Sequence, residues 1–290
     1  MLTRKKNLWI KMTIVTRGEV EFYIDERLRK DLDRVINMVK KRNEDYVWIV
    51  DGPERSGKST FGRQIAKYLD IEFSNKDISF KPDGFSRSLR EAKDGSCKLY
   101  DEAYTGLSSK SALSRVNKQL VSLLMEIGQK GLFIIIILPT FFDLDRYVAL
   151  WRSRGLFHVY RKRSRKGQWE YYNGKKKLEL YIKGKKTYSY KWPHVYYRGR
   201  FTQKPVTNEE EYQKMKKKAL REREEVPIGS KYLDQRNILI KMMRDSGMSQ
   251  AKIAEECSKQ GFSISKQTIS YILRGTGPQN DKNQEPKLIY

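Results

Sequence analysis

The chain of 290 residues contains only two cysteines and two histidines. That forms no disulfide framework and leaves almost no raw material for a Cys/His zinc centre. Cys97 and Cys257 lie far apart with no CxxC pair, so we expect a reducing, cytoplasmic location. The longest purely apolar run, residues 132–138, is far shorter than the about 20 residues of a membrane-spanning helix. No apolar stretch follows the basic residues at the N-terminus, so we expect neither a secretory signal nor a membrane partner.

Acidic residues are scarce in one segment of this strongly basic chain, whose net charge is +25. Residues 151–205 contain 17 basic and 2 acidic side chains. Residues 1–150 contain 27 and 21, and residues 206–290 contain 16 and 12. A charge that served only solubility would be spread along the chain, so this concentration favours a polyanionic partner. A solvated lysine-rich surface without a partner is the alternative.

One glycine-rich segment fits the phosphate-binding pattern G-x-x-x-x-G-K-[ST] at every fixed position. It follows a β-branched and aromatic run at 46–50, which predicts a strand, and precedes a helix with an apolar face. In this pattern the backbone N–H groups surround phosphates, Lys58 bridges phosphate oxygens as a catalytic cation, and Ser59 ligates Mg²⁺. A chance glycine-lysine turn is the alternative. The sequence thus predicts ATP and Mg²⁺ as cofactors, bound by Gly52, Pro53, Glu54, Arg55, Ser56, Gly57, Lys58, Ser59 and Thr60.

Two adjacent acids, Asp101 and Glu102, end a run that starts at Ser96 and predicts a second strand. We expect Asp101 to hold Mg²⁺ through water and Glu102 to act as the general base for the attacking water. An acidic turn after an edge strand is the alternative.

The apolar run at 132–138 is continuous rather than alternating, which predicts a strand covered on both faces of a parallel sheet. Thr140 follows it, either as a sensor of the γ-phosphate or as a helix cap or turn residue. The elements then run in the order glycine-loop strand, intervening strand, acidic strand, long helix and apolar strand. This order is that of the additional-strand catalytic glutamate group of P-loop ATPases.

Residues 115–130, 132–140 and 143–147 resemble a layout found in HerA/FtsK-like and zonular-occludens-toxin-like ATPases of viruses and mobile elements. The resemblance covers roughly residues 46–160 and differs from many HerA/FtsK-like members, which carry a glutamine where this chain has Pro139-Thr140. It implies a ring-forming homo-oligomer that moves DNA, in the host cytoplasm if a virus encodes the chain. It also implies an arginine finger for the neighbouring subunit's nucleotide, with Arg115, Arg146, Arg152 and Arg154 as candidates.

The basic segment interleaves lysine and arginine with aromatic residues, and its Lys166-Gly167, Asn173-Gly174 and Lys183-Gly184 pairs predict two or three β-hairpins. Cations track phosphates and aromatic faces stack on bases, so we expect nucleic-acid contact, with Arg161, Arg163 and Arg165 as candidates. One alternative is a hairpin core with merely exposed charges. Another is the arginine-rich lid of a small-substrate kinase.

Near the C-terminus, apolar residues recur at helical spacing in three short segments between Tyr232 and Gly275. This layout resembles the helix-turn-helix of resolvase-type and repressor-type modules that bind double-stranded DNA. A helical bundle for protein contacts is the alternative. Ile269 and Ile272 are expected to pack the inner face of the third helix against the other two. The residues that then face outward, toward bases and phosphates, are Lys266, Gln267, Thr268, Ser270, Tyr271 and Arg274.

The predicted fold class is α/β: a P-loop NTPase with a mainly parallel sheet, then a basic β-hairpin region and a small all-α helix-turn-helix domain. The expected segments are an N-terminal hairpin and helix (1–45), an ATPase core (46–160), a basic aromatic hairpin region (161–205), a charged, mostly solvated helix with a linker (206–230), a helix-turn-helix (231–276) and a disordered tail (277–290).

The predicted function is an ATP-hydrolysing, DNA-stimulated motor for translocation, packaging or mobilisation of viral or mobile-element DNA. Charge, aromatic residues and the helix-turn-helix pattern all lie outside the predicted nucleotide core, and all favour DNA. An ATP-gated DNA-binding regulator without motor activity is the first alternative. A P-loop kinase with an arginine-rich lid is the second.

Overall fold

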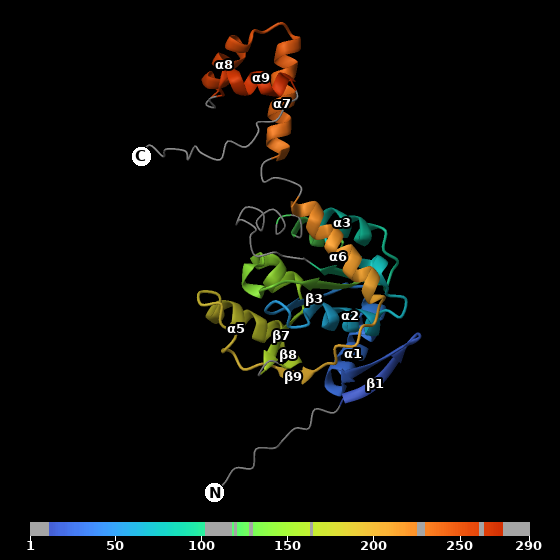
Figure 1. The fold of residues 1–290 in the computed structure, drawn as a ribbon. Helices are drawn as coiled ribbons and strands as arrows, with labels where there is room; N and C mark the ends of the chain where they lie inside the picture. The colour runs from blue at the N-terminus through green and yellow to red at the C-terminus, as the bar shows by residue number, and fades with distance from the viewer. Residues whose placement is uncertain are drawn as a thin grey trace. The chain divides into compact units, whose positions relative to one another are not determined.

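The computed structural model describes residues 12–101, 118, 121–127, 130–162, 165–224, 230–260 and 264–274 (Figure 1). Glu102, Arg115 and Arg163 lie outside these ranges, as does the predicted disordered tail at 277–290. The chain divides into two compact units, residues 1–221 and 222–290, each of which is described by itself. Within the described ranges, no helix is both long and apolar enough to cross a membrane.

A seven-stranded sheet with the order β4-β5-β6-β3-β7-β8-β9 forms the centre of the first unit. The strands from β4 to β7 in this order are parallel, and β8 and β9 extend the sheet antiparallel to β7. The predicted α/β class with a mainly parallel sheet is therefore confirmed. The strands are β3 (Tyr46–Asp51), β4 (Ile78–Ser79), β5 (Cys97–Asp101), β6 (Phe133–Ile137), β7 (Gly155–Lys162), β8 (Arg165–Asn173) and β9 (Tyr197–Arg200).

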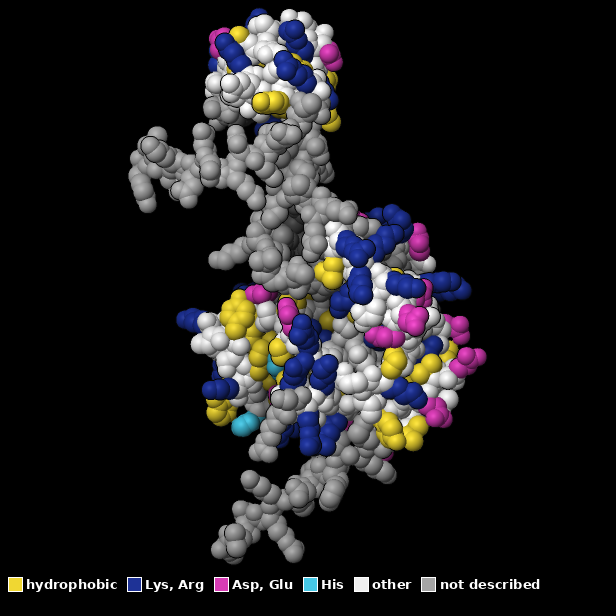
Figure 2. Space-filling view, in the orientation of Figure 1, with side chains coloured by type: hydrophobic (Ala, Val, Ile, Leu, Met, Phe, Trp, Pro, Cys, Tyr) yellow, Lys and Arg dark blue, Asp and Glu magenta, His cyan; other side chains and the backbone are white. Residues whose placement is uncertain are grey.

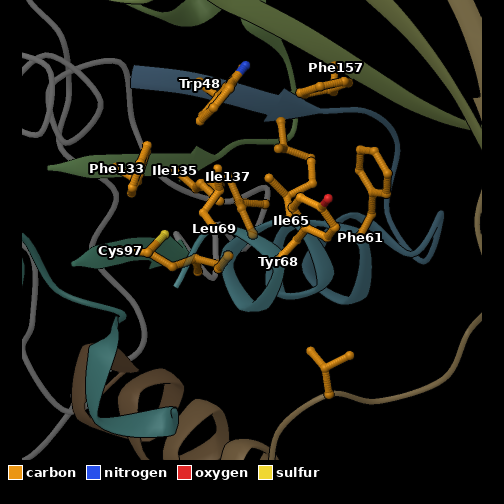
Figure 3. Close-up of a cluster of buried hydrophobic side chains, with 14 of the residues drawn as sticks. Trp48, Phe61, Ile65, Tyr68, Leu69, Cys97, Phe133, Ile135, Ile137 and Phe157 are labelled. Atoms are coloured by element: carbon orange, nitrogen blue, oxygen red, sulfur yellow. The ribbon is translucent and has the colours of Figure 1, made fainter. Parts of the chain in front are cut away.

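The central strands β3 and β6 are covered on both faces, which accounts for their continuous apolar sequences. Helix α2 (Lys58–Leu69) packs its apolar side against one face, where Phe61 lies beside Phe157 and Ile65 lies near Ile137 (Figure 3). The other face is covered by α3 (Pro82–Arg90), by a helical segment at 121–126 and by α5 (Gly174–Gly184). Alternate strand residues thus supply two separate cores.

Short helical turns connect the remaining elements of this unit. A 3₁₀ turn, η1 (Asn75–Asp77), precedes β4. After β6 come a second 3₁₀ turn, η2 (Phe141–Asp143), and a π-helical turn, η3 (Tyr147–Arg152), which lead into β7. These turns take the chain from the carboxyl end of β6 back to the amino end of β7, as a parallel connection requires.

The N-terminal segment forms a hairpin and a helix, as its alternating and then helical apolar spacing predicts. Strands β1 (Met12–Arg17) and β2 (Val20–Asp25) pair antiparallel and lead into α1 (Glu26–Arg42). The side chain of Asp25 caps α1 by accepting from the backbone N–H groups of Arg27 and Leu28, at 3.0 and 3.2 Å. Asp25 therefore satisfies two of the N–H groups that the start of a helix leaves without an intrahelical partner.

The basic segment does not form the predicted series of separate hairpins. Asn173 caps α5 by accepting from the Lys176 N–H at 3.1 Å, so Asn173-Gly174 begins a helix instead of a turn. Gly167 lies inside β8 with φ +92°, where a Cβ would lie 2.4 Å from the Phe201 carbonyl oxygen. Within the described part of residues 151–205, β7 and β8 form the one hairpin, and it belongs to the main sheet. The aromatic residues buried in that sheet are Trp169, Tyr171, Tyr172 and Tyr197.

Helix α6 (Glu209–Glu224) is not solvated on most sides, contrary to the expectation from its many charges. Tyr212 and Ala219 are buried, and Met215 and Leu220 pack against the same core as α2. These four residues lie on one stripe of the helix, so its charges occupy only the opposite side.

The second unit contains α7 (Ser230–Asp245), α8 (Gln250–Lys259) and α9 (Lys266–Arg274), which pack around a small apolar core. This core consists of Ile240, Ile253, Cys257 and Ile269. Ser249 caps α8 by accepting from the Lys252 N–H at 3.3 Å. Met243 packs against this core, whereas Ile238 and Met242 are exposed.

A buried lysine of α5, Lys177, has no acidic partner among the residues that the structure describes. Lys177 is fully buried, and its ammonium donates to the carbonyl and hydroxyl oxygens of Ser153, each at 2.5 Å. Burial lowers the pKa of Lys177 from 10.5 to about 7, and the nearby charge of Arg154 acts in the same direction. The folded protein therefore favours the neutral amine.

This lysine makes stability depend on pH. Above the folded pKa of about 7 and below 10.5, the unfolded chain binds the Lys177 proton and the folded protein does not, so the free energy of unfolding rises with pH. We expect it to rise by about 3 kcal/mol more between about pH 7 and about pH 9.5 in the wild type than in Lys177→Met. Urea unfolding of both proteins measures this difference. Identical pH profiles would contradict it.

Candidate functional site

The glycine loop (residues 52–57) lies where the carboxyl ends of the central strands meet. It follows β3 and leads directly into α2. Ile137 of β6 pairs with Val50 on one side and with Asp101 on the other. Parallel pairing therefore brings Asp101 to the same edge as the loop, although the two are far apart in the sequence.

Two glycines allow the loop to pack closely against β7 and against the segment that follows β9. Gly52 has φ +138°, and a Cβ there would lie 1.9 Å from the carbonyl oxygen of Val159 in β7. Gly57 has φ +99° and begins α2; its Cβ would lie 3.0 Å from Gln203 and 3.1 Å from Phe201. No side chain in the described part of the molecule caps this helix start. The first N–H groups of α2 are consequently available to an anion.

Lys58, the first residue of α2, is folded over the glycine loop. Its ammonium donates to the carbonyl oxygens of Gly52 and Pro53, at 2.6 and 2.8 Å. Burial lowers the pKa of Lys58, while the charges of Asp51 and Asp101 act in the opposite direction. The two acids thus favour a positive charge at the mouth of the loop.

A cleft of about 550 Å³ opens beside the loop, within the size range of small-molecule sites, which is about 300–1,000 Å³. Its first wall consists of residues 54–60 with Asp101 and Pro139. Its second wall consists of residues from β8, from the segment after β9 and from α6: Lys166, Gln203, Glu209, Tyr212, Gln213, Lys216 and Leu220. Every predicted nucleotide-binding residue from Glu54 to Thr60 lines this cleft.

The second wall is attached to the first by α2. Arg63 is buried, donates to Glu209 at 2.7 Å and to the Thr207 hydroxyl at 3.1 Å, and stacks 4.0 Å above the Tyr212 ring. Gln64 donates to the carbonyl oxygens of Thr202 and Lys204, both at 2.8 Å. Breaking the pair would leave the buried charge of Arg63 without a counter-ion, which is unfavourable. The ion pair and the cation–π contact therefore keep α2 and α6 together.

Tyr212 connects α6 to the acidic edge of the sheet. Its hydroxyl donates to Oδ2 of Asp101 at 2.5 Å, and the Ser59 side chain is its second hydrogen-bonding neighbour. The Lys216 ammonium lies 3.8 Å from the same carboxylate oxygen. The sequence prediction missed Tyr212, Lys216 and Arg63 as site residues. The apolar spacing of Tyr212, Met215 and Ala219 was the available signal, since it marks one face of α6 as buried.

A second polar cluster surrounds Asp51, the fully buried last residue of β3. Its carboxylate accepts from the Phe141 N–H at 2.7 Å and from the Tyr190 hydroxyl, and lies 2.8 Å from Nδ1 of His158. Thr140 caps η2 by accepting from the Phe142 N–H at 3.4 Å. The cap interpretation of Thr140 is confirmed, and its sensor role stays a prediction.

Three of the arginine-finger candidates, Arg146, Arg152 and Arg154, do not line the cleft of their own chain, and the fourth, Arg115, lies outside the described residues. Arg152 pairs with the buried Asp45 and donates to the Leu124 carbonyl at 2.8 Å, while Arg154 lies 3.4 Å from Glu44. Both acids precede β3, so these pairs lie at the amino edge of the sheet, opposite the glycine loop. Arg146 is exposed just before η3.

Exposed cations cover the edge strands of the sheet. Figure 2 shows Lys and Arg side chains gathered over β7 and β8. Arg161 donates twice to the carbonyl oxygen of Arg55, at 2.7 and 3.1 Å, and Lys166 lines the cleft. The basic surface is therefore continuous with the glycine loop. Its exposed members are Arg161, Lys162, Arg165, Lys166, Arg198 and Arg200.

The predicted DNA contacts of the second unit all lie on α9. Lys266, Gln267, Tyr271 and Arg274 are exposed, while Thr268 and Ser270 are half-buried. Ser265 caps the helix by accepting from the Thr268 N–H at 3.1 Å. The side of α9 opposite Ile269 is thus polar and basic.

The residues at the cleft fit a magnesium ion held mainly by phosphates and water. In the part of the chain that the structure describes, no group of three or more His, Cys, Asp or Glu side chains could hold a metal. Ser59 and Asp101 supply one hydroxyl and one carboxylate, the small set of protein ligands that Mg²⁺ commonly uses beside a nucleotide. No family model, curated protein or solved structure matches this chain, so function is inferred from its residues and their geometry.

The close approach of Gly52 to Val159 gives a test of the loop geometry. We expect Gly52→Ala to destabilise the first unit by about 2–4 kcal/mol, because its Cβ would overlap a backbone carbonyl and alanine disfavours this φ. Gly84→Ala is the control, since Gly84 lies in α3 and a Cβ there meets nothing within 4 Å. Thermal unfolding of both variants measures the difference. Equal melting temperatures would contradict this geometry.

Proposed function

We propose that the chain is an ATP-hydrolysing, DNA-directed motor that translocates, packages or mobilises viral or mobile-element DNA. The observation that carries this proposal is the meeting of the glycine loop and Asp101 at one edge of a parallel sheet. Strand β6 lies between β3 and β5, so an additional strand separates the loop strand from the acidic strand. This order supports membership of the additional-strand catalytic glutamate group.

In this proposal the glycine loop binds the phosphates of ATP. The uncapped start of α2 offers backbone N–H groups, and Lys58 exchanges its carbonyl partners for phosphate oxygens. Arg55, Arg63 and Lys166 line the same cleft and add positive charge. Charge-assisted hydrogen bonds of this kind stabilise bound phosphate more strongly than neutral ones do.

Hydrolysis to ADP and phosphate requires a metal and a base at the other side of the cleft. Ser59 and Asp101 would hold Mg²⁺, which when bound neutralises charge on the phosphate oxygens. Glu102 is proposed to orient and deprotonate the attacking water. The finger that Arg115, Arg146, Arg152 or Arg154 would supply belongs to a neighbouring subunit of a ring.

The basic surfaces support nucleic acid as the partner. Of the six exposed cations of β7, β8 and β9, Arg161 contacts the glycine loop and Lys166 lines its cleft, and α9 presents Lys266 and Arg274 from a compact three-helix unit. Contacts with phosphates provide affinity and contacts with base edges provide specificity. We assign the sheet edge to phosphate contacts and α9 to a duplex groove.

Lys58→Ala tests the nucleotide site. Loss of the cation that bridges the phosphates is expected to weaken ATP binding by about 10- to 100-fold. Lys76→Ala is the matched control, because Lys76 is exposed on η1 and does not line the cleft. Calorimetric titration with ATP measures both. Wild-type affinity in Lys58→Ala would refute the assignment of the loop.

Asp101→Asn tests the metal site. We expect the variant to bind ATP but to lose turnover by about 100-fold or more, because the metal loses its anionic partner. Asp94→Asn, an exposed position before β5, is the control and should hydrolyse ATP normally. Phosphate release at several Mg²⁺ concentrations provides the comparison. Unchanged turnover in Asp101→Asn would show that the acidic strand has another role.

The double variant Lys266→Ala/Arg274→Ala tests the second unit. Removal of two phosphate contacts is expected to weaken duplex binding by about 10-fold or more and to reduce the salt-dependence slope by about 2. Lys241→Ala on α7 is the control. Fluorescence anisotropy with labelled duplex, at several salt concentrations, measures both quantities. An unchanged slope would indicate that α9 does not contact DNA.

A further inference from the structure

Tyr212 lies between the two residues that the proposed function assigns to the metal. Its hydroxyl donates to Oδ2 of Asp101 at 2.5 Å and has Ser59 as its other hydrogen-bonding neighbour. All three side chains line the same cleft. One hydroxyl of α6 therefore connects the loop hydroxyl to the carboxylate at the end of β5.

Lys216 places positive charge beside the same carboxylate. Its ammonium lies 3.8 Å from Oδ2 of Asp101, one helical turn beyond Tyr212. The hydrogen bond from Tyr212 and the positive charge of Lys216 together stabilise the negative charge of Asp101, which a bound divalent cation would otherwise neutralise. Helix α6 thus supplies both interactions that Asp101 would obtain from a hydrated metal.

We propose that α6 and metal-bound nucleotide compete for Ser59 and Asp101, so that loading of Mg²⁺ with nucleotide requires the start of α6 to withdraw. This inference rests on the proposed function. Magnesium demands a nearly octahedral shell of oxygen ligands, and the Tyr212 hydroxyl occupies the hydrogen-bonding position on Asp101 that the metal or its bound water would use.

Because neighbouring side chains enclose the Tyr212 ring, withdrawal of its hydroxyl from Asp101 requires the helix itself to move. The ring is buried, stacks under Arg63 at 4.0 Å and lies 5.7 Å from the ring of Phe80. A ring enclosed in this way cannot rotate out of the cleft by itself, because close-packed neighbours fill the space around it. The hydroxyl leaves Asp101 only when the backbone of α6 moves.

Tyr212→Phe in the full chain tests the competition. The variant keeps the ring packing and removes only the hydroxyl. We expect Mg²⁺ to increase ADP affinity about 10-fold more in Tyr212→Phe than in the wild type. The reason is that the form in which α6 contacts Asp101 loses a hydrogen bond to a charged group. The affinity for ADP in EDTA should be unchanged. Tyr23→Phe, at an exposed position outside the cleft, is the control. Lys216→Met should act in the same direction with a smaller change.

Hydrogen exchange of the wild type provides a second readout that does not depend on a variant. Addition of ADP with Mg²⁺ should accelerate amide exchange in residues 209–216, while ADP in EDTA should not. Protection of α6 by ADP with Mg²⁺ would overturn the competition. A weaker effect of Mg²⁺ in Tyr212→Phe would also overturn it, because Tyr212 would then position Asp101 for the metal.

The outcomes separate this inference from the proposed function. If the wild type and the variant bind ADP with the same Mg²⁺ dependence, the competition is wrong and the nucleotide site stands. If neither protein binds ADP under any condition, the proposed function fails and the inference fails with it.

Discussion

The pairing of β6 between β3 and β5 is the constraint on which the site depends. Val50 and Asp101 both pair with Ile137, so the loop strand and the acidic strand end at the same level. The continuous apolar sequence of β6 requires cover on both faces, which fixes its place in the middle of the sheet. Gly52 then fits against the backbone of Val159 only because it has no Cβ. The closeness of Lys58 and Asp101 follows from this arrangement.

The second wall of the cleft comes from parts of the chain that lie far from the loop in sequence. Arg63 reaches Glu209 across a separation of 146 residues, and Arg161 donates to the carbonyl of Arg55 across 106. The edge strands and α6 therefore belong to the same structural unit as the glycine loop. They surround this edge of the sheet with cations and place one tyrosine hydroxyl on Asp101. The proposed nucleotide and nucleic-acid functions share this edge.

Much of the fold could be predicted because strong local patterns determined it. The N-terminal hairpin and helix and the apolar runs of β3 and β6 all correspond to structure at the predicted positions. Helix α5 was missed because Asn173-Gly174 suits both a hairpin turn and a helix start, and only the following residues decide between them. Helix α6 was misjudged because its charges outnumber its apolar stripe. Tyr212 and Arg63 could not be identified as site residues from sequence, since their roles depend on contacts made only after folding.

The most direct test of the central claim is phosphate release from ATP by the full chain with Mg²⁺, measured with and without duplex DNA at several salt concentrations. The proposed motor predicts faster release with DNA, and a smaller acceleration as salt screens the basic surfaces. Release that is the same with and without DNA would contradict the motor. The absence of any ATP turnover would contradict the assignment of the glycine loop and Asp101 to catalysis.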